Sequence, residues 1–178
     1  ATLAAQNTPA GSVPFFVGAG AYKHHVPASV DHLIQRSEFL TSYTPYQAEI
    51  SQGRLETLLN FHTVITELTG MELANASLLD EGTAAAEAMI MMFNARSKEA
   101  VKNGNNVFFA DENIFPQTLD ILKTRSEALG IKLVIGPYLA LSTEKNTYGL
   151  LIQYPDSKGE VQDYRNGTEV AHESAISV

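Results

Sequence analysis

Hydrophobic and polar positions follow a helical spacing in the first half of the chain. Leucine and isoleucine residues recur at this spacing between residues 51 and 68, which predicts a helix. They are Leu55, Leu58, Leu59, Ile65 and Leu68. Ser51 can cap the start of this helix, and Gly70 can end it because glycine readily adopts a left-handed backbone. A shorter helix is predicted over residues 28–39.

Short apolar runs alternate with helical segments in the rest of the chain. Residues 73–77 predict a short buried strand, and the alanine-rich residues 84–101 predict a helix that Asn103 and Gly104 end. The remaining predicted elements are strands at 107–110, 132–135 and 148–154, helices at 116–129 and 166–173, and the first part of a strand at 176–178. Strand–helix alternation with hydrophobic strands predicts the α/β class, with a mostly parallel sheet and helices on both faces.

The pattern also suggests how the chain is divided. We expect residues 1–50 to form an extended, turn-rich segment with one short helix, and residues 51–178 to form an incomplete α/β domain. No repeat, low-complexity tract or linker interrupts the sequence. Because the chain starts without methionine and stops inside a predicted strand, we expect it to be a piece of a longer protein.

Composition narrows the functional classes. The 178 residues are 44% hydrophobic and 18% charged, as in soluble globular domains. A net charge of −8, from 12 basic and 20 acidic residues, disfavours nucleic-acid binding. No apolar run approaches the roughly 20 residues of a membrane span. The absence of cysteine excludes disulfides and thiolate nucleophiles and is compatible with the cytoplasm, where we expect the protein.

Two loops carry candidate chemistry. Asp80, Glu81, Gly82 and Thr83 open a predicted helix, where α/β proteins often bind phosphate. The two carboxylates would repel a phosphate, so an ordinary helix-initiating turn is the favoured interpretation. The loop Tyr43–Gln47 combines aromatic and hydrogen-bonding side chains around a proline, which fits either a functional loop or an aromatic turn at an interface.

Metal and nucleophile signatures are weak. His24 and His25 are adjacent, so in an extended segment they point to opposite faces and do not suit one metal ion. The sequence contains no HExxH pair, no GxSxG elbow and no lysine-bearing phosphate loop. We therefore expect no metal.

Two long strings in the sequence, TPYQAEISQG and ANASLLDEGTAAAEA, are distinctive. They belong to a set of five stretches, at residues 16–27, 41–55, 73–89, 108–130 and 148–164. These stretches resemble one family, the glycine-decarboxylating P-protein of the glycine cleavage system. This resemblance implies a large domain of a fold-type I enzyme dependent on pyridoxal phosphate, taken from the N-terminal of two homologous halves.

The resemblance also implies a reaction and partners. In the family, pyridoxal phosphate takes up the electrons released as carbon dioxide leaves glycine. The remaining aminomethyl group passes to the lipoyl arm of the H-protein. The C-terminal half holds the coenzyme, and the N-terminal half packs against it. Glycine, the lipoylated H-protein and the C-terminal half are therefore the expected partners.

This chain departs from the family's coenzyme-binding pattern. Its phosphate-loop counterpart keeps Gly82 but places Asp80 and Glu81 beside it, and Glu112 stands where the coenzyme-bearing half has a stacking histidine. None of its seven lysines matches the motif of the lysine that forms the Schiff base. We expect no catalytic residue and no coenzyme in this chain, which by itself should be inactive.

The resemblance leaves a role for the aromatic loop open. Our hypothesis is that the loop and the residues after it line the glycine site of the other half. The lining residues would be Tyr43, Thr44, Tyr46, Gln47, Ser51 and Gln52. The alternatives are a half that only supports its partner, and a piece of another fold-type I enzyme. An exposed sheet edge and apolar face also predict a homo-oligomer or self-association.

Overall fold

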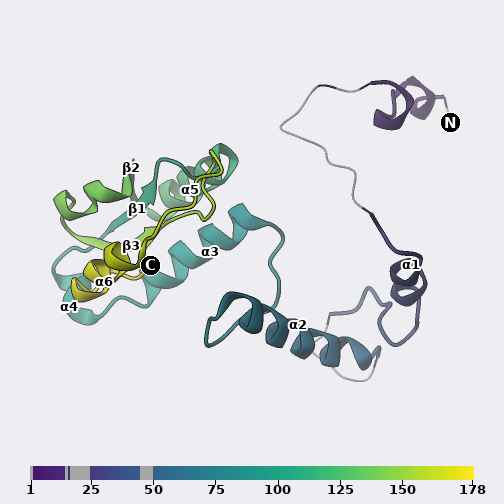
Figure 1. Ribbon diagram of the computed structural model, residues 1–178, viewed down its shortest axis with the longest axis horizontal. Helices are drawn as coiled ribbons and strands as arrows, with labels where there is room; N and C mark the ends of the chain where they lie inside the picture. Colours follow the sequence, from purple (N-terminus) through teal and green to yellow (C-terminus); the bar gives the residue numbers. More distant parts are fainter. Residues whose placement is uncertain (1, 15, 17–24, 45–49) are drawn as a thin grey trace. The chain divides into compact units, whose positions relative to one another are not determined.

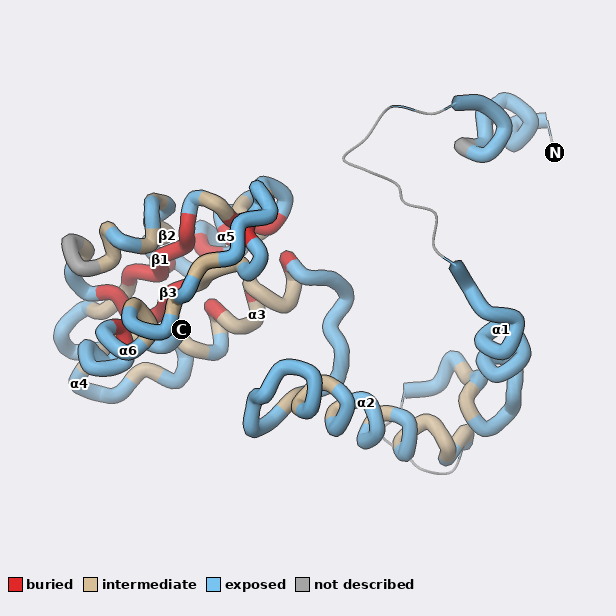
Figure 2. The backbone as a smooth tube through the Cα atoms, in the orientation of Figure 1, coloured by how far each residue is buried: buried red, intermediate tan, exposed pale blue. Residues whose placement is uncertain are grey.

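A computed structural model describes residues 2–14, 16, 25–44 and 50–178. The chain forms two compact units, Ala1–Ala76 and Ser77–Val178. The domain division expected after residue 50 stays a prediction. None of the described residues of the first unit is buried, whereas the second unit holds a continuous core (Figure 2).

The first unit is helical. Its elements are the 3₁₀ turns η1 (Ala4–Gln6) and η2 (Ala10–Ser12) and the helices α1 (Ala28–Ile34) and α2 (Gly53–Thr69) (Figure 1). The predicted helix over residues 51–68 is confirmed, and Gly70 ends it with φ at 71°. The prediction that Ser51 caps α2 is wrong, because its hydroxyl donates to the Ser37 carbonyl at 2.8 Å. Helix α1 stops at Ile34, five residues short of its predicted end.

The second unit contains a parallel sheet. Strands β1 (Val107–Asp111), β2 (Lys132–Gly136) and β3 (Thr147–Leu151) lie in the order β2-β1-β3, and both pairings are parallel (Figure 1). Ser177 continues this sheet beyond β3, since it forms a parallel bridge with Gly149. The strand expected at the end of the chain is therefore placed on the β3 edge.

Helices cover both faces of the sheet. On one face, α3 (Glu81–Asn94) and α5 (Pro116–Leu129) pack against one another and against the strands, and Phe108 lies in this core at 0% exposure. On the other face, η3 (Tyr138–Thr143) and α6 (Arg165–Glu173) lie beside Leu150. The α/β class with a parallel sheet is confirmed.

Helix α5 shows how local signals fix an element. Pro116 occupies its first turn, where no backbone donor is needed, and Gly130 ends it with φ at 67°. Its bounds agree with the predicted range. The shorter helix α4 (Lys98–Lys102) begins at Ser97, whose side chain accepts from the Ala100 N–H at 3.1 Å.

Three predicted elements need correction. Residues 73–77 form no strand, and Leu73 is 87% exposed, because no described strand pairs with this run. The predicted helix over 84–101 is two helices, because α3 ends at Asn94 and Ser97 caps the start of α4. Between them Arg96 donates to the carbonyl of Phe93 at 2.6 Å and lies over its ring. Strand β3 ends at Leu151 and not at residue 154.

Candidate functional site

The predicted phosphate loop lies at the start of α3. Asp80 is the N-cap of this helix, and its Oδ1 accepts from the Thr83 N–H at 2.7 Å. This hydrogen bond lowers the pKa of the Asp80 carboxyl. The N–H that a phosphate would use is thus already bound by a carboxylate, and Glu81 adds a second negative charge in the first turn. The turn interpretation describes this geometry, and a phosphate does not fit it.

Gly82 serves helix packing. It is buried, and a Cβ built on it would lie 2.4 Å from Cδ1 of Ile121 on α5. The absence of a side chain lets α3 approach α5 closely at this point. Close packing of the two helices therefore accounts for glycine at position 82 without a bound phosphate.

The carboxyl end of the sheet is the usual ligand-binding edge of a parallel α/β fold. There Asp111 is buried, and its two carboxylate oxygens accept from the N–H groups of Asn113 and Tyr138, each at 2.8 Å. Glu112 follows it and is exposed, with its backbone N–H donating to the Gly136 carbonyl at 3.0 Å. A carboxylate in this place offers no ring to stack on a pyridine.

A cavity of about 420 Å³ lies at this edge. It is lined by Glu81, Ala85, Ile114, Phe115, Thr118 and residues 151–156. Asp156 is 4% exposed, and its Oδ1 accepts from the N–H groups of Lys158 and Glu160, both at 2.8 Å. Its Oδ2 has no hydrogen-bond partner among the described residues. This lining contains two carboxylates and no cation, so it does not suit an anionic coenzyme.

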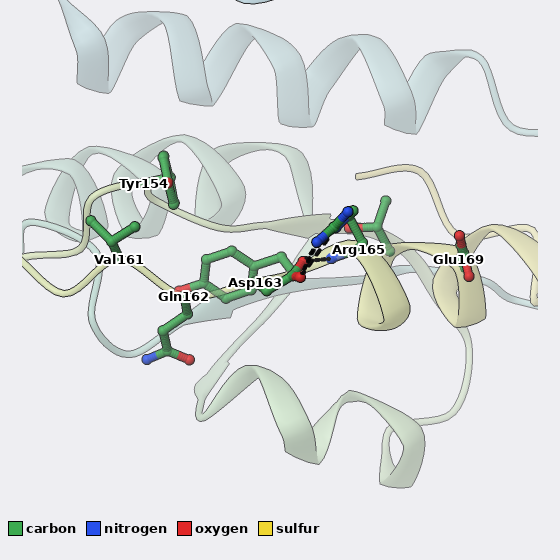
Figure 3. Close-up of a pocket in the computed structure, with 8 residues that line it drawn as sticks. Tyr154, Val161, Gln162, Asp163, Arg165 and Glu169 are labelled. Carbon is green, nitrogen blue, oxygen red and sulfur yellow. Dashed lines mark hydrogen bonds and ion pairs between the residues drawn. The ribbon is translucent and has the colours of Figure 1, made fainter.

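A surface depression beside this edge contains an arginine that is already paired. It lies between Tyr154 and Glu169, and Figure 3 shows Arg165 pointing at Asp163. Nη2 of Arg165 lies 2.6 Å from Oδ2 of Asp163, and this contact lowers the pKa of Asp163 to about 2. Arg165 is therefore not free to hold a phosphate. Burial raises the pKa of Tyr164, and the charges of Asp111 and Asp156 raise it further.

Metal chemistry finds no support in the described part of the chain. No group of three histidine, aspartate or glutamate side chains comes close enough there to hold an ion. His24 lies outside the described residues. None of the described helices has the length and apolar content to cross a membrane.

The aromatic loop is described only in part. Tyr46 and Gln47 lie outside the described residues, so their predicted place beside a substrate is not tested. Before them, the Thr41 hydroxyl accepts from the Tyr43 N–H at 3.1 Å. Gln52 stands at the N-cap of α2 but forms no capping hydrogen bond there.

Three residues at the carboxyl end of the sheet and at the start of α2 were not identified from the sequence. Asp156, Arg165 and Arg54 carry no motif, although Asp156 stands in a polar turn after a strand, and Asp163 and Arg165 are spaced to pair. Each is identified by its contacts only. Nη1 of Arg54 donates to the Tyr43 carbonyl at 2.5 Å.

Comparison with known proteins shows which family the chain is similar to. The model of the glycine cleavage system P-protein family matches residues 1–178. Glycine dehydrogenase (decarboxylating) of Flavobacterium johnsoniae is 48% identical over 164 residues, which cover 92% of this chain and 17% of that protein. The probable glycine dehydrogenase (decarboxylating) subunit 1 of Xanthobacter autotrophicus is 47% identical over 182 residues, which cover 98% of this chain and 39% of that protein.

A solved structure agrees with these relatives. The crystal structure of glycine decarboxylase (P-protein) of the glycine cleavage system, in inhibitor-bound form, matches with a TM-score of 0.75 and 34% sequence identity. The match covers 98% of this chain and 39% of that one. The chain thus spans well under half the length of the relatives it matches. It belongs to the glycine cleavage system P-protein family.

Proposed function

We propose that this chain is part of an enzyme that decarboxylates glycine with pyridoxal phosphate and transfers the aminomethyl group to the lipoylated H-protein. The observation that carries the proposal is the family match over the whole chain, together with relatives named glycine dehydrogenase (decarboxylating). The same match leaves no support for the alternative of an aminotransferase or another fold-type I enzyme. The expected place of action is the cytoplasm.

We further propose that the coenzyme is held by the C-terminal half and not by this chain. Three features support this. Asp80 binds the N–H that a phosphate would need, Glu112 stands where a ring would stack, and the cavity that contains Asp156 has an acidic lining. A phosphate placed at this edge would face uncompensated negative charge.

The contribution of this half would then be to line the glycine site of its partner. Tyr43, Thr44, Tyr46 and Gln47, followed by Ser51 and Gln52, supply aromatic surface, hydroxyls and amides. Such groups bind a small zwitterion and exclude water from it. A purely supporting half is the second candidate, and the exposed apolar residues of the first unit favour it, since they offer a surface for a partner protein or a second copy.

The test uses the complete enzyme with glycine and lipoylated H-protein. Tyr46→Phe and Gln47→Ala should each raise the KM for glycine while both halves stay assembled, because they remove substrate contacts without removing the interface. Unchanged kinetics with intact assembly would leave only the supporting role. Omission of the C-terminal half should abolish carbon dioxide release, and sedimentation of this chain alone would test its self-association.

A further inference from the structure

Asp156 places a buried carboxylate oxygen without a partner at the carboxyl end of the sheet. The residue is 4% exposed and lines the cavity of about 420 Å³ at this edge. No described group donates a hydrogen bond to its Oδ2. A polar oxygen that is removed from water and left unbonded raises the free energy of the folded protein, so a donor at this position would be stabilising.

Backbone hydrogen bonds fix the direction of this carboxylate. Its Oδ1 accepts from the N–H groups of Lys158 and Glu160, both at 2.8 Å, and the Asp156 N–H donates to the Glu160 carbonyl at 3.1 Å. The Ser157 N–H donates to the Asn113 carbonyl at 2.8 Å, which joins this turn to the residues after β1. The turn therefore holds Oδ2 in one place, while Oδ1 is committed to the backbone.

The rest of the cavity lining is apolar or already hydrogen-bonded. The apolar surface comes from Ala85, Ile114, Phe115, Leu151, Ile152 and Pro155. Gln153 also lines the cavity, but its Oε1 accepts from the Phe115 N–H at 2.9 Å and its Nε2 donates to the Pro155 carbonyl at 3.1 Å. Glu81 adds a second carboxylate, and none of the described lining residues is a lysine or an arginine. These groups suit a ligand with a carbon body and a positively charged donor.

A nitrogen cation suits this lining, whereas a metal ion or an amino acid does not. In the described part of the chain, no three carboxylate or histidine side chains come together to hold an ion. A zwitterion such as glycine would bring its own carboxylate close to Glu81 and Asp156, and the like charges would repel one another. The Lys158 ammonium, although close in sequence, forms no ion pair with any described carboxylate.

We propose that this cavity binds a protonated aliphatic amine without a carboxylate, whose ammonium donates to Oδ2 of Asp156 and whose carbon chain packs against the apolar lining. The cavity volume falls in the range of small-molecule sites, and the carboxyl end of a parallel sheet is the usual place for such ligands. A charge-assisted hydrogen bond is also stronger in a site from which water is excluded. The amine site does not depend on the proposed role of the chain in glycine turnover.

Binding is measured on the complete enzyme, loaded with its coenzyme, with protonated N,N-dimethylbutylamine as the probe. A tertiary amine does not condense with the aldehyde of pyridoxal phosphate, so its binding is separate from the chemistry of the coenzyme. The neutral comparison is n-butanol, which has the same carbon chain without a charge. Calorimetry gives the dissociation constant, and hydrogen exchange over residues 151–160 shows whether the probe lies in this cavity.

Asp156→Asn and Glu160→Gln form a matched pair, because each replaces one carboxylate of the same turn by an amide. Asp156→Asn keeps an acceptor for the two backbone donors but puts an amide N–H in place of Oδ2. Glu160 is not among the residues that line the cavity, so its variant controls for the loss of charge alone. Lys158→Gln tests whether the ammonium of this neighbour competes for the same oxygen.

The probe should bind the unaltered enzyme and slow exchange over residues 151–160, and n-butanol should do neither. Asp156→Asn should weaken binding of the probe by roughly tenfold or more, as for the loss of a hydrogen bond to a charged group. Glu160→Gln should change the affinity by less than about threefold, as for an exposed charge. Lys158→Gln should leave binding unchanged or strengthen it.

No binding of the probe to the unaltered enzyme would overturn the proposal. Equal affinity of the unaltered enzyme and Asp156→Asn would also overturn it, as would equal binding of n-butanol or a loss of binding in Lys158→Gln. Exchange measured without the probe shows whether the turn is intact in each variant. The comparison between the amine and n-butanol uses the unaltered enzyme, so it tests the proposal even if Asp156→Asn does not fold.

Discussion

Gly149 on β3 leaves room for the ring of Phe108 on β1. A Cβ built on Gly149 would lie 2.8 Å from Cε2 of Phe108 and 3.0 Å from Sδ of Met92. Phe108 is fully buried and lies on the sheet face that α3 and α5 cover. Because the ring has no free space to move into, the sheet requires glycine at this position.

Gly149→Ala should therefore destabilise the protein by about 1–3 kcal/mol, the usual cost of overpacking a core. Thermal unfolding would measure it, with Gly11→Ala as the control, since no atom lies within 4 Å of a Cβ built there. The double variant Gly149→Ala with Phe108→Leu should cost less than the sum of the single changes. Additive losses would show that the ring does not make the contact.

The Asp156 turn predicts a contrast between two substitutions. Asp156→Ala removes the acceptor of two N–H groups from a buried site and should cost about 1–3 kcal/mol. Asp156→Asn keeps an oxygen for those donors and removes an unpartnered carboxylate oxygen, so stability should change little. Equal losses in thermal unfolding would contradict the assignment of the two oxygens.

The Asp80 cap predicts that the stability of the first turn of α3 depends on pH. The hydrogen bond from the Thr83 N–H lowers the pKa of Asp80. The ionised carboxylate therefore stabilises the helix fully above the ordinary aspartate pKa, and this stabilisation is lost as the pH falls through the lowered pKa. The backbone amides in the first turn of α3 should lose protection against hydrogen exchange at acidic pH. Asp80→Asn, which still accepts a hydrogen bond but does not titrate, should remove that dependence. A first turn that loses protection equally in both proteins would contradict the cap.

The position of Arg96 over two aromatic rings predicts that lysine in its place makes the protein less stable. Its guanidinium carbon lies 3.5 Å from the ring centroid of Phe93 and 5.5 Å from that of Tyr148. Arg96→Lys should cost about 1 kcal/mol in thermal unfolding, because lysine loses the stacked geometry. Arg125→Lys is the control, since Arg125 and Glu87 form an exposed pair with 3.8 Å between Nη1 and Oε1. Equal effects of the two substitutions would rule out the stacking contribution.

The sequence predicted elements whose signals are local. Pro116 and Gly130 mark the two ends of α5, and hydrophobic runs mark β1 and β2, so these ranges agree with the structure. Residues 73–77 failed because a strand needs a neighbour, and periodicity does not report one. The break after α3 was missed although Ser97, which caps α4, is a residue type that starts helices.

The site was less predictable than the fold. The resemblance identified the family and the departures at Asp80 and Glu112, both of which are visible in the residues themselves. It did not identify Asp156, because an aspartate in a polar turn is ordinary until its burial is known. Arg54 was missed because the carbonyls of Thr41 and Tyr43 that it binds lie 13 and 11 positions away, beyond any local pattern.

We propose that this half carries no coenzyme of its own. The most direct test is the amount of pyridoxal phosphate bound by the purified complete enzyme, measured by absorbance and by mass after borohydride reduction. The account predicts one coenzyme for each pair of homologous halves, attached outside residues 1–178. Two coenzymes per pair, or a stoichiometric adduct on one of the seven lysines of this chain, would contradict it.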